Sequence, residues 1–294
     1  MKHINLNWDI CLLLSSFNRT ATTRRSGHAC PDYHHQNTTE GQAQRWLGRA
    51  PLKMKRIIAL CAIVISFVSF SQDDNWEQLF NGKDLSGWSV ICKPQDKDKV
   101  FWTVDNGAIL CNSIGNKDHN KVWLISDREF SDFELRLKFQ AYSDSPGNSG
   151  VQFRCHYDYN TRGGMLHGPQ VDINPPAPIQ WRTGLIFDET LGENRWVSPN
   201  LPSWEMPLEH EPEKHIFKYA EDGDGWNELI IICKGMKIKT IVNGIVRTDW
   251  DATGHLDNEL HKKYNVGTSG HFAFQLNSGD ELRIRYKDII IKEL

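Results

Sequence analysis

The sequence predicts an all-β sandwich or jelly roll of antiparallel strands over residues 72–294. Many short segments in this range are rich in β-branched and aromatic residues and are separated by turn signals such as Asn-Gly and Ser-Gly. No segment keeps a period of 3.6 residues over several turns, as an amphipathic helix would. Regularly spaced short strands without helices are typical of sandwiches and jelly rolls.

A signal peptide is expected immediately before this domain, at residues 54–71. Lys53, Lys55 and Arg56 supply a basic stretch, the apolar run 57–70 follows, and small residues two positions apart end it. The apolar run is shorter than the roughly 20 residues that a membrane-spanning helix needs. The mature chain is therefore expected to have no transmembrane segment.

Cleavage after this segment would make Gln72 the first residue of a periplasmic or secreted protein. Residues 1–53 precede the predicted signal peptide and show neither helix nor strand periodicity. They are predicted to be an upstream extension that belongs to no domain, with translation beginning at Met54.

Charge and aromatic content narrow the classes of function. The formal net charge is -3 and the isoelectric point about 6.5, and no basic stripe appears, so we expect no nucleic-acid partner. The chain has 11 tryptophans and 11% aromatic residues, and exported domains rich in aromatics often handle sugars. A small sugar is therefore one candidate partner, by association alone.

Four cysteines lie in the predicted mature chain, and an oxidising compartment permits disulfides. Cys92 and Cys111 flank a short predicted hairpin and are the favoured pair, with free buried cysteines as the alternative. Spacing alone does not fix the connectivity.

The strands are predicted from alternation and from the turns between them. The clearest is 133–139, where four apolar residues alternate with charged ones, as in a strand with one buried face. Asn106-Gly107 and Asn243-Gly244 predict tight hairpin turns, because both central positions need positive φ. The expected strands are 88–92, 101–104, 108–111, 122–125, 133–139, 150–156, 170–173, 226–233, 236–242, 245–250, 270–276 and 282–292.

Three segments are predicted to be loops. Prolines and glycines keep 159–168 and 175–178 out of helix and ladder alike. The segment 189–213 holds four prolines and is expected to be a long irregular loop, which in a compact domain is usually functional or disordered. Trp196 and Trp204 within it favour a packed loop near a binding surface.

Two of the predicted strands carry unusual polar side chains. Gln152, Arg154 and His156 alternate with apolar residues in one, and Gln170 and Asp172 do so in the other. Side chains two apart on a strand point the same way, so each strand would present a face of amide, guanidinium, imidazole or carboxylate groups. Groups of this kind bind ligands or move protons, and a functional site is expected there.

Several motifs together resemble the 3-keto-disaccharide hydrolase domain family. They are Leu79–Trp88, Asn148–Arg154, Gly168–Ile173, Trp226-Asn227 and 287–292, in the order of the family and spread over nearly all of the predicted domain. The resemblance implies an exported bacterial protein with a concanavalin-like jelly roll and a sugar site on its concave sheet. It also implies a lyase or hydrolase acting on glycosides already oxidised at C3.

Such a reaction would need a base, an acid and a group that stabilises an enolate. A C3 ketone acidifies the C2 proton, so a modest base can remove it, the C1 substituent can leave, and water can add back to give net hydrolysis. A divalent cation or a cationic side chain would stabilise the enolate, and no other cofactor is expected. The residues implied in catalysis, as base, acid or metal ligands, are Asp172, Glu189 and His167. The residues implied in binding the sugar are Arg154, Gln170, Asp188, Gln275 and His271.

The chain departs from one form of the family pattern. Many members carry Glu at the position of Gln170 and His at that of Asn277. Others have the Gln-x-Asp form seen here, followed by a Tyr-Asp-Glu-like triplet that 187–189 resembles. If the Glu of the first form is the base, this chain has lost it or Asp172 has replaced it.

Other functions and roles stay open on the sequence alone. The protein could be a non-catalytic sugar-binding jelly roll, or an ordinary glycoside hydrolase whose two carboxylates lie roughly 5–9.5 Å apart. Asp172 could face solvent on an edge strand, and Arg154 could be a structural ion-pair partner. His271 could be a histidine of the sheet face, and Asp188 with Glu189 a loop charge pair.

Overall fold

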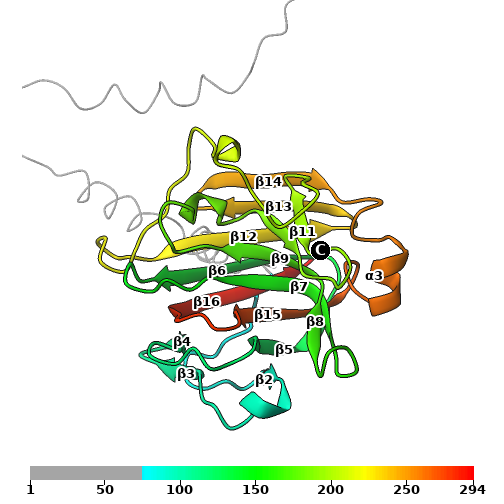
Figure 1. Ribbon diagram of the computed structural model, residues 1–294. Coiled ribbons are helices and arrows are strands. Elements are labelled where there is room, and N and C mark those ends of the chain that lie inside the picture. The colour runs from blue at the N-terminus through cyan, green and yellow to red at the C-terminus, as the bar shows by residue number, and fades with distance from the viewer. Residues whose placement is uncertain (1–74) are drawn as a thin grey trace, which may run out of the picture. The chain divides into compact units, whose positions relative to one another are not determined.

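Two antiparallel sheets of eight strands each make up the part of the chain that the computed structural model describes, residues 75–294 (Figure 1). The predicted all-β sandwich is confirmed. The predicted extension 1–53 and signal peptide 54–71 lie outside the described residues. Among residues 75–294, no helix has the length and apolar character needed to cross a membrane.

The first sheet has the strand order β14-β13-β12-β6-β16-β4-β3, and β1 pairs with β16. Its central strands, β6 and β16, are far apart in sequence, so the fold depends on long-range pairing. The strands are β1 (Glu77–Gln78), β3 (Trp102–Asp105), β4 (Ala108–Asn112), β6 (Phe133–Ala141), β12 (Asn227–Lys234), β13 (Lys237–Val242), β14 (Ile245–Asp251) and β16 (Arg283–Glu293).

The second sheet has the order β11-β10-β9-β7-β15-β5-β2, and β8 pairs with β7. Its strands are β2 (Trp88–Cys92), β5 (Val122–Phe130), β7 (Ser149–Asp158), β8 (Met165–His167), β9 (Pro169–Ile173), β10 (Ile186–Asp188), β11 (Arg195–Ser198) and β15 (Gly270–Leu276).

The core lies between the facing sides of the two sheets. The apolar side chains of β6 at 133, 135, 137 and 139 are buried, as their alternation predicts. They share one cluster with Val151, Phe153, Val171 and Ile186 of the second sheet. Burial of this shared surface is the main force that holds the two sheets together.

Both predicted hairpin turns are present. Asn106 and Gly107 have φ of 46° and 74°, and Asn243 and Gly244 have 50° and 78°. Two consecutive positive φ values match the right-handed twist of the flanking strands, so each turn sets the register of its hairpin.

The structure contains short elements that the sequence pattern does not predict. A six-residue helix, α3 (Glu259–Tyr264), is capped by Asn258, whose side chain accepts hydrogen bonds from two main-chain N–H groups. Strands β8, β10 and β11 fall in segments assigned to loops or left unassigned. Each is only three or four residues long, too short for a period to show.

The predicted pairing of Cys92 with Cys111 is wrong. Cys92, Cys111, Cys155 and Cys233 are all free. Cys92 lies on β2 of the second sheet, whereas Cys111 is buried on β4 of the first.

The predicted alternation of β7 is interrupted at Arg154. Gln152 pairs with Ala273 and Cys155 with His271. Between these two pairs β7 advances by three residues and β15 by two, so β7 has one extra residue. Arg154 has φ of 49°, outside the range of regular strands. This β-bulge turns Arg154 away from the face of Gln152, so the expected polar face does not extend along the strand.

Candidate active site

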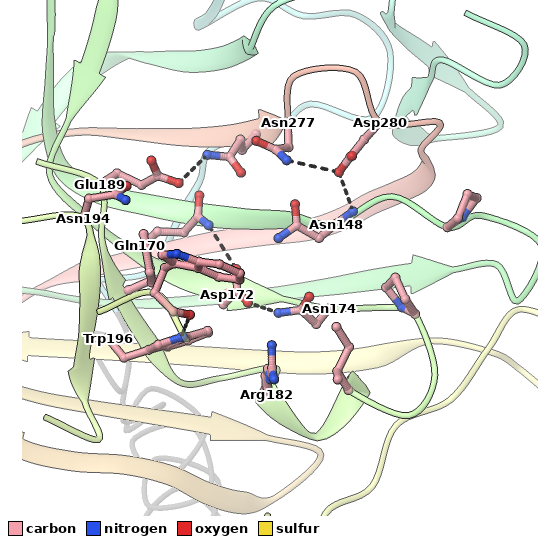
Figure 2. Close-up of a pocket in the computed structure, with 16 residues that line it drawn as sticks. Asn148, Gln170, Asp172, Asn174, Arg182, Glu189, Asn194, Trp196, Asn277 and Asp280 are labelled. Atoms are coloured by element: carbon pink, nitrogen blue, oxygen red, sulfur yellow. Dashed lines mark hydrogen bonds between the residues drawn. The ribbon is translucent and has the colours of Figure 1, made fainter. Parts of the chain in front are cut away.

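A cavity of about 440 Å³ opens on the outer face of the second sheet (Figure 2). Val171 of β9 packs in the core, whereas its neighbours Gln170 and Asp172 line the cavity, so the two faces of β9 separate core from site. Gln275 of β15 lies on the same outer face. Residues that border the cavity include Asn148, Gln170, Asp172, Asn174, Arg182, Glu189, Asn194, Trp196, Asn277 and Asp280.

Asp172 is a buried carboxyl group at one side of this cavity. Its Oδ1 accepts a hydrogen bond of 3.1 Å from Gln170 Nε2, and its Oδ2 accepts one from Asn174 Nδ2. Burial, with a further contribution from the charge of Glu189, raises the pKa of Asp172 to about 8. The hydrogen bond from Gln170 and the positive charge of Arg182 act in the opposite direction, but burial is the larger effect. Asp172 therefore keeps its proton at neutral pH.

Glu189 follows directly after β10 and has a different environment. Its Oε1 accepts a hydrogen bond of 3.1 Å from Gln275 Nε2, and its Oε2 lies 2.5 Å from Lys121 Nζ. The Lys121 ammonium places a positive charge beside this carboxylate. The two carboxyl groups of the site thus have different surroundings: Asp172 is buried among amide side chains, and Glu189 forms an ion pair.

Glu189 also borders a second cavity of about 260 Å³, which Lys121, Trp123 and Arg162 help to line. Asn194 is the other residue that borders both cavities. Glu189 therefore stands at the junction of two adjoining spaces.

Gly150 of β7 makes room for Gln170. A Cβ atom at Gly150 would lie 2.3 Å from Gln170 Cδ, closer than real Cβ contacts. Gly150 and Asp172 are register partners on β7 and β9, so the Gln170 side chain crosses the strand where no side chain stands. Gln170 Oε1 and Asn148 Oδ1 have no hydrogen-bond partner among the described residues, and both side chains border the cavity.

Two tryptophans and one cation also border the cavity. Trp196 Nε1 donates to the carbonyl of Trp204 over 2.8 Å, which ties β11 to the proline-rich loop after it. Arg182, at the end of the 3-10 helix η2 (Gln180–Arg182), donates from Nη2 to Met206 O over 2.7 Å. Its Nε has no partner among the described residues. The loop with Trp196 and Trp204 thus lines a cavity with aromatic surface, as ligand sites commonly do.

The one group of three converging metal-ligating side chains among residues 75–294 lies outside this cavity. Each oxygen of Asp172 and Glu189 already accepts a hydrogen bond from an amide or an ammonium group.

Four of the eight predicted site residues border the cavity: Gln170, Asp172, Glu189 and Gln275. Arg154 does not, which corrects its interpretation as a sugar ligand. Its buried guanidinium donates to the main-chain carbonyls of Ser131, Gly235 and Gly267 and to Asp132 Oδ1. The alternative, a structural ion pair, is what the structure shows.

His167 and Asp188 are buried and contact residues of α3. The His167 ring stacks on Tyr264 with centroids 3.9 Å apart, and its Nδ1 accepts from the Leu191 N–H. Burial lowers the pKa of His167. Asp188 is buried and lies 2.9 Å from Nε2 of His261 on α3. Neither residue borders the cavity, so direct roles in catalysis or sugar binding are not supported.

His271 also lies away from the cavity, at the other end of β15. Its Nδ1 is 2.8 Å from the carbonyl of Ser126, and its Nε2 is 3.5 Å from Glu129. Within residues 75–294, Glu129, His156 and His271 form the one group of three metal-ligating side chains that converge.

Several residues in or beside the cavity carry no signal in the sequence. Lys121 precedes a strand like many solvated lysines, and Arg182 lies on a single-turn helix in a loop. Asn174 lies two residues after Asp172, as Asp172 lies two after Gln170, so it continues the same face of β9. This spacing could have predicted Asn174 as a residue of the cavity. The approach of Lys121 to Glu189 spans 68 positions of the chain, and only the folded sheet brings it about.

The family match covers most of the chain. The sequence model of the family described as 3-keto-alpha-glucoside-1,2-lyase-like domain matches residues 75–292. Among curated proteins, human Ephrin-B1 is 27% identical over 146 residues, which cover 42% of this chain and 40% of that protein. The match therefore spans less than half of Ephrin-B1, and it does not show a shared family.

Solved structures with a similar fold are distant in sequence. A candidate glycosyl hydrolase from Parabacteroides distasonis has 19% identity and a TM-score of 0.49, covering 74% of this chain and 94% of that one. A protein of unknown function with a galectin-like fold from Bacillus subtilis has 12% identity and a TM-score of 0.47, covering 71% and 90%. Both similarities are too weak to carry a functional assignment.

Proposed function

Because the chain belongs to the 3-keto-alpha-glucoside-1,2-lyase-like domain family, we propose that its cavity binds a 3-keto-glycoside and cleaves the glycosidic bond by elimination and hydration. Family membership makes it a carbohydrate-active jelly-roll protein. The reaction and its residues are the proposal.

The observation that supports the proposal most strongly is the contrast between Asp172 and Glu189. The reaction needs a base for the C2 proton and an acid for the departing oxygen at the same time. Asp172, with a pKa raised to about 8 by burial, holds a proton at neutral pH and suits the acid. Glu189 carries its carboxylate beside Lys121 and suits the base.

The proposed steps balance in atoms and charge. Glu189 accepts the C2 proton, the C1–O bond breaks, and Asp172 gives its proton to the leaving oxygen. Water then adds across C1 and C2: its hydroxyl bonds to C1 and its proton returns to Asp172, while Glu189 gives a proton to C2. Both carboxyl groups are restored, and the net reaction is hydrolysis. Arg182, a cation whose Nε has no partner among residues 75–294, is the proposed stabiliser of the enolate oxygen.

The two cavities suggest how a disaccharide would lie. Glu189 and Asn194 border both spaces, so a substrate that crosses this junction would place its glycosidic region beside Glu189. Gln170, Asn148 and the two tryptophans would hold the oxidised sugar in the larger space. The second space, lined by Trp123 and Arg162, would take the leaving sugar.

An ordinary glycoside hydrolase is the second candidate, because the same two carboxyl groups could serve as acid and nucleophile or base. A sugar-binding module without catalysis is the third, and the aromatic side chains of the cavity would suit it.

The test uses the purified full chain with a 3-keto-disaccharide and with its unoxidised parent, each with and without chelator. We expect cleavage of the keto form alone and no effect of chelator. The variants Asp172→Asn and Glu189→Gln should each lower kcat by roughly 100-fold or more, the usual range for acid–base groups. Asp118→Asn, at a fully exposed carboxylate, is the matched control and should leave kcat unchanged.

Other results of this test would indicate a different function. Cleavage of the parent sugar would identify an ordinary hydrolase, and binding without cleavage would identify a module. Loss of activity with chelator while the chain stays folded, restored by added metal, would give the enolate role to a cation.

Export is proposed from the sequence pattern of residues 54–71. N-terminal sequencing of the protein recovered from outside the cytoplasm should begin at Gln72. Recovery of a chain that still contains residues 54–71 from the cytoplasm alone would contradict export.

A further inference from the structure

Three metal-ligating side chains meet on three neighbouring strands of the second sheet. Glu129 lies on β5, His156 on β7 and His271 on β15, which runs between the other two. One ligand atom from each lies within 4.8 Å of the others. None of the three borders the cavity of Asp172 or the adjoining one.

The distances fit a shared ion better than direct hydrogen bonds. Glu129 Oε1 lies 3.3 Å from His156 Nε2 and 3.5 Å from His271 Nε2. Charge-assisted hydrogen bonds are shorter, at about 2.7–2.9 Å. Ligand atoms placed about 2.0–2.1 Å from a tetrahedral ion lie about 3.3 Å from one another. The two distances from Glu129 thus match such a coordination shell, and the third pair of ligand atoms lies within 4.8 Å.

The tautomer of His271 leaves the correct nitrogen free. Its Nδ1 is 2.8 Å from the Ser126 carbonyl, which can only accept, so Nδ1 carries the proton. The lone pair of the neutral ring is then on Nε2, the atom that faces Glu129. A main-chain carbonyl behind a histidine is the usual arrangement that orients a metal ligand.

The backbone brings these side chains together by irregular pairing. His271 pairs with both Glu129 and Cys155, and the register of β15 shifts against β5 and β7 immediately after this point. His156 follows Cys155. The side chains are 20% exposed for His156, 23% for His271 and 51% for Glu129, so an ion can reach the group from solvent.

We propose that the protein binds one divalent transition-metal ion of the zinc type at this site, called here the β5–β7–β15 site. Glu129 supplies a carboxylate oxygen, His156 and His271 supply their Nε2 atoms, and water takes the fourth position. Two imidazoles select transition metals over magnesium and calcium. The ion joins three strands across their irregular ends and stabilises the folded state.

This site is separate from the proposed reaction. His271 and Gln275 are four residues apart on β15, which corresponds to roughly 13 Å along a strand. The metal site therefore does not rest on the proposed function, and its test does not use activity.

The test measures metal stoichiometry of the full chain after equilibrium dialysis against zinc at neutral pH. The difference between variants is the readout, because the chain contains other histidines and cysteines. Wild type should bind one ion per chain more than His271→Ala and more than Glu129→Gln, whose affinity should fall by roughly 100-fold or more. His210→Ala, at an exposed histidine outside the site, should bind as wild type does.

Two further measurements, the visible absorption of bound cobalt and the Tm with zinc, test the same site. Cobalt in place of zinc should give the intense visible absorption of a tetrahedral ion in wild type, which Glu129→Gln should lose. Zinc should raise the Tm of wild type and of His210→Ala but not that of Glu129→Gln. The half-exposed Glu129 is a safe position for substitution, so this variant decides the matter if His271→Ala fails to fold. Equal stoichiometry in wild type and Glu129→Gln would overturn the proposal.

Discussion

Asp172 shows how burial can outweigh hydrogen bonding at a single carboxyl group. Two amide side chains donate to its oxygens, which favours the charged form, yet its pKa is raised to about 8 because little solvent reaches it. Glu189, across the same cavity, has an ammonium group as partner instead. The difference between two residues of similar chemistry is the basis of their proposed acid and base roles.

The buried proton of Asp172 should make stability depend on pH. Its pKa is about 8 when folded and about 3.8 when unfolded, so between these values the folded chain holds a proton that the unfolded chain has lost. This contribution is fully present below pH 4 and is lost as pH rises toward 8. The free energy of unfolding of wild type, relative to Asp172→Asn, should fall by up to about 1.4 kcal/mol per pH unit over this range.

Denaturant titrations of the two proteins at several pH values measure this difference. Asp118→Asn serves as control, because its carboxylate is exposed and its removal should leave the pH dependence of wild type unchanged. A constant difference between wild type and Asp172→Asn from pH 4 to 8 would show that Asp172 is ionised in the folded protein.

Gly150 should be required for the position of Gln170. In Gly150→Ala the new Cβ would lie within 2.3–2.7 Å of three Gln170 side-chain atoms, so Gln170 must leave its place. We expect a loss of stability of about 1–3 kcal/mol, as for overpacking, and a higher KM for the 3-keto substrate. Unfolding titrations and steady-state kinetics measure the two effects.

The double variant Gly150→Ala/Gln170→Ala provides the control, since it removes the atoms that the Cβ would meet. Its stability should be higher than the sum of the two single effects predicts. Additive effects would mean that Gly150 is needed for another reason.

At the scale of elements, the bulge of β7 converts a predicted ligand into a structural residue. Arg154 leaves the outer face and satisfies three main-chain carbonyls and Asp132. Those groups come from segments near residues 131, 235 and 267, so one side chain joins β7 to three other parts of the fold.

Arg154→Ala should therefore affect stability and not substrate binding. The loss of these hydrogen bonds leaves buried carbonyl groups without a donor, and we expect a fall of roughly 3 kcal/mol in the free energy of unfolding. Arg136→Ala, at a half-exposed arginine paired with Glu134, should change stability by less than about 1 kcal/mol.

Thermal unfolding and the KM of the folded fraction distinguish the two roles of Arg154. A raised KM with wild-type stability would restore its interpretation as a sugar ligand.

The sequence predicts some elements well because they depend only on residues close together in the chain. The alternation in β6 and the Asn-Gly turns depend on neighbouring residues alone, and the structure confirms them. The alternation of Gln170 and Asp172 also correctly separates the cavity face of β9 from its core face.

Other elements depend on distant partners. Strand β10 is three residues long and exists as a strand because β9 and β11 flank it. The short helix α3 holds His261 against Asp188, 73 positions earlier. No period in the sequence reports such contacts, and so Asp188 is predicted as a sugar ligand although it faces a helix.

At the scale of the whole molecule, the cavity is made by bringing together segments near residues 146–148, 170–204 and 275–280. Lys121 joins this group through its contact with Glu189. The sequence predicts that Gln170, Asp172, Glu189 and Gln275 carry function, but not that Lys121 and Arg182 lie beside them. Residue type identifies the chemistry, whereas the register between distant strands decides which residues share a site. For the same reason His271, on the same strand as Gln275, belongs to a different group of side chains.

The most direct test of the proposed reaction is the fate of the hydrogen at C2. The full chain would cleave a 3-keto-disaccharide in D₂O, and the released 3-keto sugar would be analysed at once by mass spectrometry and NMR. Free 3-keto sugar kept with the Glu189→Gln variant for the same time corrects for exchange without catalysis. Elimination and hydration predict one deuterium at C2 in each product molecule, because the proton held by Glu189 exchanges with D₂O before a proton returns to C2. Product that keeps its original hydrogen at C2 would contradict the proposed mechanism and indicate direct hydrolysis.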